Sequence, residues 1–487
     1  MAFSLRRSMA WMTLSQGCGA VLQFATTVVV ARLLTPYETG VFAVATAIAG
    51  AIALLRTFGL SNYVIRAPAV DRDFLAGVFT VNIIVSALVA VLIALISLAG
   101  GKLLGEPGVR HVLLALAVVP LLACLEFVPS SCIERAGNFR VVALVNLVRN
   151  AIGSAVILAA AYAGHSYMSL AYGQITSALV AVAVMNVVGW RHASLRLGLK
   201  GWRDIARYGI DILTTSGVST ITQRMLDVVL GWMLGLHALG LYSRAAGLMA
   251  MIWENFQVIM LRVAFVELVS QRNAGHSFRG SYLRILSVST ALLWPAFGGL
   301  AVVSGPALRT IYGPQWVEAA PVLSLLAIGG IVTTTILLTW EVFMASDETR
   351  RLAKLQVVQS SFSLVAFTLG CLGGIVGAAA ARVVETLFNM RIYRPHLARM
   401  TETNAADVLP IFGRAAVLMA LAIAPAMAVM LLHGWSPDAP LLQVLPAVAA
   451  GMLCWLVGLW RMDHPLYREI RRAAARLFPR LAAPPTP

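Results

Sequence analysis

Five arginines lie within stretches of sequence that are otherwise apolar, where a charged side chain calls for a chemical reason: Arg56, Arg149, Arg224, Arg262 and Arg382. A charge at the centre of a bilayer costs roughly 2.5–3.5 kcal/mol on insertion scales, so residues of this kind need a specific role. A guanidinium group stays charged and binds two phosphate oxygens at once with its planar fork. Arginines in such surroundings therefore call for an anionic partner, either a ligand or a carboxylate of the protein.

Ion pairs that hold helices together are the alternative explanation for several of these charges. Asp227 follows Arg224 by three residues, and Glu385 follows Arg382 at the same spacing, so each pair would share one helix face and neutralise itself. Arg149 lies close enough to the expected cytoplasmic face for its long side chain to reach the interface. A binding role is expected first for Arg56 and Arg262, with Arg224 third.

Carboxylates occupy the same apolar stretches: Glu126, Asp211, Asp227, Glu254, Glu341 and Glu385. A carboxylate inside a membrane can bind a proton or Na⁺ and couple a transport cycle to an ion gradient. Asp227 and Glu254 are the candidates for this role, and packing or pairing remains an open alternative for both. The eight histidines fall at the ends of apolar stretches or between them, so we expect no metal site. No nucleotide-binding sequence, catalytic constellation or cofactor site is recognised either.

Composition places these charges in a membrane. Of the 487 residues 59% are apolar and only 12% are charged, with a mean hydropathy of +0.83. Soluble domains carry about 25% charged residues, so a soluble fold could not bury this much apolar surface. The net charge of +16 is typical of the basic cytoplasmic loops of membrane proteins, and the basic residues are not interleaved with aromatics, so no nucleic-acid partner is expected.

Apolar stretches of about 20 residues predict some fourteen transmembrane helices and an all-α polytopic membrane protein. The division between the eleventh and twelfth rests only on Gly370, Gly373 and Gly374. The expected spans are 12–34, 41–64, 74–98, 112–132, 141–163, 168–190, 208–234, 240–268, 282–304, 317–345, 352–372, 374–393, 411–432 and 441–460.

The charges between these spans predict the orientation. An even number of spans puts both termini on one side, and that side collects most of the Lys and Arg, which predicts cytoplasmic termini and an uncleaved first helix. The basic tail 463–487 is expected to form an amphipathic helix on anionic lipid. The opposite side holds few basic residues: Arg32, Lys102, Arg110, Arg244 and Arg309.

A weak internal repeat relates the two halves of the chain. Gly40-Val41-Phe42 matches Gly240-Leu241-Tyr242 at an offset of 200 residues, and Arg140 matches Arg350 at an offset of 210. Repeated halves with a site between them are typical of transporters. The predicted organisation is a six-helix lobe over 1–195, a second six-helix lobe over 196–400, two additional helices over 401–462 and a basic cytoplasmic tail over 463–487.

Several short motifs, in this order and spacing, resemble the oligosaccharide flippase branch of the multidrug/oligosaccharidyl-lipid/polysaccharide exporter superfamily. They are Gln16 and Gln23 in the first helix, Ala31 to Pro36 followed by Gly40, Phe58-Gly59-Leu60, Glu134-Arg135 through Phe139-Arg140, and Leu239 to Ala245. The resemblance implies two six-helix lobes around a central cavity, usually with two extra helices. It also implies export of undecaprenyl-pyrophosphate-linked oligosaccharide across the bacterial inner membrane for polysaccharide biosynthesis, with the polymerase and export machinery as further partners.

One departure from the family pattern bears on the site. The family often has an acidic residue just before Phe-Gly-Leu, where this chain has Arg56-Thr57. The change favours a cationic cavity, in which Arg56 and Arg262 occupy corresponding helices of the two lobes. It weakens the transfer of an acidic ion site to this position.

Other classes of protein fit the sequence less well. A cation-coupled multidrug antiporter of the same superfamily needs an acidic or aromatic cavity, which the excess of arginine disfavours. A membrane-bound glycan polymerase or ligase needs a large extracytoplasmic loop, and every such loop expected here is short. The sequence leaves open a non-catalytic scaffold for a polysaccharide synthesis complex. No enzymatic activity is expected.

Overall fold

The computed structural model describes residues 2–56, 60–67, 70–103, 106–190, 196–198, 202–274 and 277–477. Within some helices, including 2–14, 208–216 and 258–266, the described features are those of the backbone alone. All regular structure in the described chain is helical, which confirms the predicted fold class. The chain forms two compact units, Met1–Ser243 and Arg244–Pro487. The lobe boundaries expected at 195/196 and 400/401 stay predictions.

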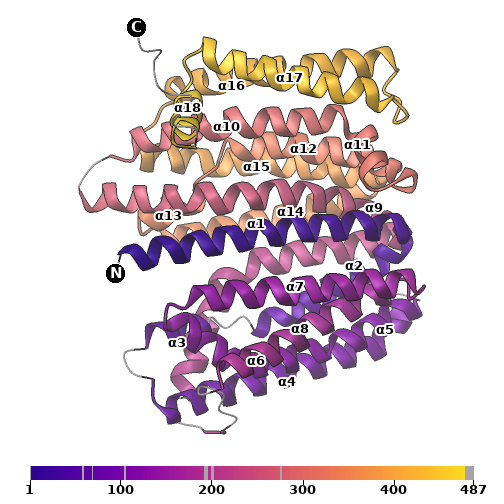
Figure 1. The fold of residues 1–487 in the computed structure, drawn as a ribbon, viewed down its shortest axis with the longest axis vertical. Coiled ribbons are helices and arrows are strands. Elements are labelled where there is room, and N and C mark those ends of the chain that lie inside the picture. Colours follow the sequence, from indigo (N-terminus) through magenta and orange to yellow (C-terminus); the bar gives the residue numbers. More distant parts are fainter. Residues whose placement is uncertain are drawn as a thin grey trace. The chain divides into compact units, whose positions relative to one another are not determined.

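The first unit is built from helices that pack both on their neighbours in sequence and on helices further along the chain. α7 packs on α8 and α1, α6 packs on α8 and α4, and α5 packs on α4 and α2. Its helices are α1 Ala2–Leu33, α2 Pro36–Ala53, the 3₁₀ turn η1 Leu54–Arg56, α3 Leu60–Arg66, α4 Arg72–Leu103, α5 Pro107–Leu116, α6 Val118–Arg135, α7 Phe139–Tyr162 and α8 Met168–Val188. Figure 1 traces these elements along the chain.

The long helix α9, Trp202–Asn273, continues from the first unit into the second. Its regular backbone is interrupted at Gly235, whose φ of 85° lies in the region that glycine tolerates without steric cost. The interruption falls between the expected spans 208–234 and 240–268, where the sequence predicts a change of helix. α9 therefore contains two successive helical segments that meet at a glycine.

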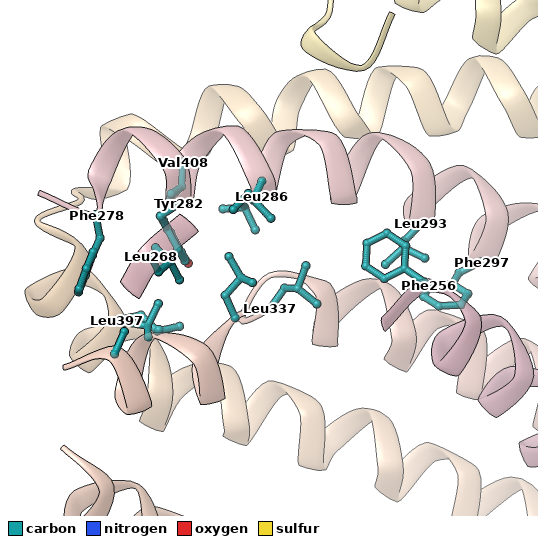
Figure 2. Packing of buried hydrophobic residues seen from close by; sticks show 14 of the residues in the cluster. Phe256, Leu268, Phe278, Tyr282, Leu286, Leu293, Phe297, Leu337, Leu397 and Val408 are labelled. Carbon is teal, nitrogen blue, oxygen red and sulfur yellow. The ribbon is translucent and has the colours of Figure 1, made fainter. Parts of the chain in front are cut away.

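The second unit contains a buried core beneath α10. The remaining helices are α10 Arg279–Val302, α11 Ser304–Ile311, η2 Pro314–Ala319, α12 Ala320–Thr334, α13 Thr339–Ala345, α14 Thr349–Cys371, α15 Gly374–Thr401, α16 Ala405–Leu432, α17 Leu441–Arg461 and α18 Pro465–Leu477. Figure 2 shows Tyr282 beside Leu268 towards one end of the core and Phe256 beside Phe297 towards the other. Inside a membrane such side chains stabilise the fold through close van der Waals packing, because lipid tails are as apolar as the side chains themselves.

The described chain contains fewer candidate membrane spans than the fourteen that the sequence predicts. Eleven segments of the described chain are long and apolar enough to cross a bilayer. One of them, Gly217–Gln257, covers parts of two expected spans, and α1 and α15 are not among the eleven. The chain is a multi-pass membrane protein, and the count of fourteen stays a prediction.

One expected span is broken. The sequence predicts a continuous helix over 317–345, whereas α12 ends at Thr334 and α13 begins at Thr339. Leu338, immediately before α13, has a left-handed backbone with φ of 68°. Threonine hydroxyls bond to backbone carbonyls on both sides of the break: Thr334 Oγ1 to Gly330 O at 2.9 Å in the last turn of α12, and Thr339 Oγ1 to Ile336 O at 2.5 Å where α13 begins. Within the break the Ile336 and Leu337 amides donate to the Thr333 and Thr334 carbonyls at 3.1 and 3.2 Å, so tight turns take the place of the helical ladder.

The basic C-terminal segment forms the expected helix, α18, which contacts α10 and α17. Its anchor is His464, a buried residue whose ring nitrogen Nε2 lies 3.0 Å from Ser287 Oγ. Burial and, secondarily, the charge of Arg414 lower the pKa of His464, so the imidazole is neutral at pH 7. Leu466 packs into the same apolar cluster as Leu459. The role of this helix on anionic lipid stays a prediction.

The repeat-related glycines meet each other in the first unit. A Cβ added to Gly40 would lie 1.8 Å from the carbonyl oxygen of Leu236, and one added to Gly240 would lie 1.8 Å from that of Pro36. Both glycines and both carbonyls differ by 200 residues (240 − 40 and 236 − 36), so the contact is reciprocal. Small residues let helices approach this closely in membranes. The contact supports the predicted repeat at this offset.

The start of α2 is fixed by local chemistry that the sequence displays. Thr35 caps the helix by accepting from the Glu38 amide at 3.3 Å, and the Glu38 carboxylate accepts in return from the Thr35 amide at 2.7 Å. Pro36 follows at the first helical position, where its missing amide hydrogen is not needed. This capping box sets the register that brings Gly40 to the crossing with α9.

Replacing Gly240 by Ala should lower the free energy of unfolding by about 1–3 kcal/mol, because the new methyl group would overlap a backbone carbonyl that cannot rotate away. Thermal unfolding of purified protein in detergent measures the effect. The matched control is Gly247→Ala on the same helix, where an added Cβ meets nothing within 4 Å and Ala improves helix propensity. Equal stability of the two variants would contradict the close crossing.

Candidate functional site

Arg56 lies in η1, the 3₁₀ turn that ends α2, and its side chain is half-buried. The turn places it near Glu126 of α6, which interacts electrostatically with both Arg56 and Arg149. The Arg149 Nη1 atom on α7 is 3.8 Å from Glu126 Oε1. Three helical elements of the first unit thus bring together two guanidinium groups and one carboxylate.

The cluster carries an excess of one positive charge. Glu126 is 22% exposed and Arg149 is 37% exposed at their side chains, so the pair is partly shielded from solvent. One carboxylate can neutralise only one of the two arginines, and the uncompensated guanidinium is a strong site for an anion in surroundings of low dielectric. The chemistry that this arrangement supports is reversible binding of a phosphate group through charge-assisted hydrogen bonds.

Arg224, the third arginine expected at the site, lies on α9 against the same helix, α2. Its Nε atom would be 3.1 Å from a Cβ placed on Gly50, six residues before Arg56. The guanidinium therefore runs along a part of α2 that has no side chain of its own. Arg224 is an exposed residue, and its binding role stays a prediction. The structure thus places two of the three expected arginines beside the second half of α2.

The remaining expected residues are Arg262, Asp227 and Glu254. Arg262 belongs to α9, but its side chain lies outside the described residues. Asp227 is half-buried on α9, one turn beyond Arg224, and Glu254 is exposed in the second unit. An ion-coupling role for Asp227 or Glu254 and a cavity role for Arg262 stay predictions.

Arg382 has the structural role that its spacing suggested. Its Nη1 atom donates to the Glu385 carboxylate, three residues further along α15, and to Ser363 Oγ on α14 at 3.2 Å. Glu385 is only 3% exposed. The pair neutralises itself within the second unit and holds α14 against α15, which confirms the prediction of an ion pair.

Glu126 and Glu341 are the residues whose roles sequence analysis missed. The contact of Glu126 with Arg149 joins two helices, so no spacing along the chain could reveal it.

Glu341 is 6% exposed and lies in the first turn of α13, directly after the helix break. The run of threonines from Thr333 to Thr335 was the available signal, since threonine bonds to backbone carbonyls at such breaks. A buried carboxylate at a broken membrane helix can hold a proton or a cation.

No group of His, Cys, Asp or Glu side chains in the described part of the chain could hold a metal ion. The free cysteines lie apart in apolar surroundings or on the surface. The site is therefore described by its arginines and carboxylates alone.

The fold is that of membrane flippases and drug transporters. The structure matches the inward closed conformation of the lipid II flippase MurJ with a TM-score of 0.74 and 15% identity, covering 94% of this chain and 99% of that one. It also matches an inward-facing multidrug resistance transporter of the MATE family, in the MOP superfamily, with a TM-score of 0.60 and 15% identity over 80% of this chain and 96% of that one. At these identities the likeness concerns the fold.

Sequence comparison identifies the family. Residues 29–321 match the model of the family described as polysaccharide biosynthesis protein, and the chain belongs to this family. It is 27% identical to the succinoglycan biosynthesis transport protein ExoT of Rhizobium meliloti (strain 1021), over 68% of this chain and 67% of that protein. It is 21% identical to the lipopolysaccharide biosynthesis protein WzxC of Escherichia coli (strain K12), over 74% and 75% of the two chains. The family resemblance seen in the sequence motifs is confirmed.

Removing one partner of the Arg382–Glu385 pair should destabilise the protein by about 3–5 kcal/mol, because the other charge is left buried and unpaired. The double replacement R382M/E385L should restore most of this stability. Thermal unfolding of E385L alone and of the double variant tests the expectation, and glycan export by the double variant should stay near normal. Loss of export in a stable double variant would show that the pair takes part in transport.

Proposed function

We propose that the protein is a flippase that carries undecaprenyl-pyrophosphate-linked oligosaccharide from the cytoplasmic to the periplasmic leaflet by alternating access. The observation that carries the proposal is the Arg56–Glu126–Arg149 cluster, an intramembrane site with excess positive charge in a chain of a polysaccharide biosynthesis family. ExoT, a succinoglycan transport protein by name, and WzxC support export of a cell-surface glycan.

The pyrophosphate of the cargo is the group that the protein has to shelter from hydrocarbon. It carries about two negative charges, and hydrocarbon excludes them unless they are paired. In our proposal Arg56 binds the phosphate oxygens through its fork, while Glu126 neutralises Arg149. Arg224 and Arg262 are the further arginines that we assign to the same anion. The polyprenyl tail stays in lipid, so only the head group has to be sheltered.

Membrane potential can supply part of the driving force. Two uncompensated negative charges leaving a negative interior gain about 4–5 kcal/mol per 100 mV, at about 2.3 per charge. Coupling to an ion gradient would add to this and needs a carboxylate that changes its state. Of the candidates, Glu341 is buried and Asp227 half-buried, whereas Glu254 is exposed. Burial makes proton or cation binding strongly coupled to conformation, which favours Glu341 and Asp227.

The same proposal includes the setting of the protein. Both termini lie in the cytoplasm of a bacterial inner-membrane protein, because the basic loops fall on that side. The chain itself catalyses no covalent chemistry, and a polysaccharide polymerase and export machinery act on the cargo after it. The alternative is a cation-coupled multidrug antiporter, because a MATE transporter has the same fold. A cluster with excess positive charge repels the cationic drugs that such an antiporter carries.

Replacing Arg56 by Ala should abolish glycan export while the protein remains inserted, because the phosphate loses its charge-assisted partner. Lys at this position should restore export in part, since it keeps the charge but lacks the fork. Arg262→Ala should resemble Arg56→Ala. Flipping of a fluorescent pyrophosphate-linked glycolipid in proteoliposomes is the measurement. Arg110→Ala, which removes an exposed arginine elsewhere in the first unit, serves as the control. Normal flipping by Arg56→Ala would exclude the anion site.

Glu341→Gln should remove any dependence of flipping on an imposed proton or Na⁺ gradient, because a neutral amide cannot release a proton or attract a cation. Asp227→Asn should have a smaller effect of the same kind, and Glu254→Gln should behave as the wild type. Initial flipping rates in proteoliposomes, with and without each gradient, distinguish the three. A gradient response that survives in Glu341→Gln would assign coupling to another group or to the potential alone.

A further inference from the structure

Arg244 lies on α9, nine residues beyond the break at Gly235, and belongs to the second unit. Two aromatic rings of the same unit lie close to its guanidinium group. The Cζ atom is 5.3 Å from the centroid of the Trp316 ring and 5.9 Å from that of Tyr312. Both rings are almost fully buried, at 0% and 2% exposure, so the faces that they present to the arginine are fixed.

The backbone between the two rings holds them in place. Gly313 has a φ of 115°, and the 3₁₀ turn η2 begins at Pro314, so the chain folds back within four residues. The Trp316 amide donates to the Gly313 carbonyl at 3.2 Å, and the two rings pack edge to face at 6.4 Å. We call Arg244, Tyr312 and Trp316 the aromatic clasp. It orients a guanidinium group that would otherwise be flexible.

The clasp supplies no hydrogen-bond acceptor to the guanidinium group. Among the described residues Arg244 forms no ion pair or hydrogen bond, and its Nε atom is buried without a partner. Aromatic rings attract the cation through their π faces, but they do not accept hydrogen bonds from its five N–H groups as a carboxylate or phosphate oxygen does. A buried donor without an acceptor costs about 1–3 kcal/mol, and more when it is charged.

Arg309, close to the clasp in sequence, is an arginine that a carboxylate of the protein neutralises. It lies on α11, only three residues before Tyr312, and it forms an ion pair with Asp438 between α16 and α17. Figure 1 shows α11 at the opposite end of the second unit from α18. Two arginines at the same end of the unit thus differ: Arg309 is neutralised by a carboxylate, whereas Arg244 has aromatic faces and no anion.

We propose that the aromatic clasp is an oxyanion site, in which the unpartnered guanidinium group of Arg244 binds the phosphate group of a lipid. The inference rests on the proposed function, because it places the clasp on the periplasmic side and makes the phosphate of the released or returning carrier its natural ligand. A phosphate offers several acceptor oxygens in the plane of the fork and supplies the missing negative charge. The phosphate of an ordinary phospholipid has the same chemistry and is the second source.

The test uses the full-length protein in nanodiscs of phosphatidylcholine, a lipid without net charge. Undecaprenyl phosphate and phosphatidylglycerol are titrated separately, and binding is followed by native mass spectrometry together with ligand-induced thermal stabilisation. Arg244→Gln should weaken binding about 10- to 100-fold, the range expected for a charge-assisted hydrogen bond. Arg244→Lys should have an intermediate affinity, and the matched control Arg309→Gln should stay within about twofold of the wild type.

The outcomes separate the alternatives. Selective binding of undecaprenyl phosphate that depends on Arg244 assigns the clasp to the carrier, and equal binding of both lipids assigns it to phospholipid head groups. Wild-type affinity and wild-type ligand stabilisation in Arg244→Gln, even with a lower melting temperature, would overturn the proposal and leave Arg244 a packing residue. Glycolipid flipping by the wild type is measured in parallel, so failure of the proposed function would be seen separately from failure of the clasp to bind phosphate.

Discussion

An arginine in a membrane-spanning segment must be matched by something that replaces water, and the charged residues of this protein are arranged around that requirement. Removal of a guanidinium group from water costs several kcal/mol, and a carboxylate returns this only when the geometry is good. The chain meets the requirement in three ways. Arg382 has Glu385 on its own helix, Arg149 has Glu126 on a neighbouring helix, and Arg244 has two aromatic rings. Where compensation is incomplete, an anion has a place to bind.

Incomplete compensation of an arginine connects the fold to transport. Arg56 shares the single carboxylate of its cluster with Arg149, so the cluster keeps an excess of positive charge. In the proposed function a phosphate uses this charge, and the binding energy must be modest, because a carrier that held its cargo tightly in one leaflet would not release it in the other. A neighbouring carboxylate is one means of limiting affinity, since Glu126 would compete with the phosphate for the same guanidinium groups.

The sequence predicted the features that depend on short separations along the chain. Apolar stretches located the helices, and the change of helix at Gly235 fell where two spans were expected to meet. The Arg382–Glu385 pair followed from a spacing of three residues. The contact between Glu126 and Arg149 could not be predicted, because it depends on how α6 packs beside α7. The break before α13 was missed for another reason: its residues are as apolar as those of an unbroken helix, and only a run of threonines marks it.

The reciprocal contact of Gly40 and Gly240 has a consequence for motion. Each glycine lies against a backbone carbonyl of the other helix, so the two main chains are in contact at this point. Val44 packs against Gly231 and Arg224 against Gly50, so side chains continue the contact along the same two helices. Backbone atoms cannot move aside as side chains do, and any rearrangement of the first unit therefore has to keep the separation of α2 and α9 at this crossing.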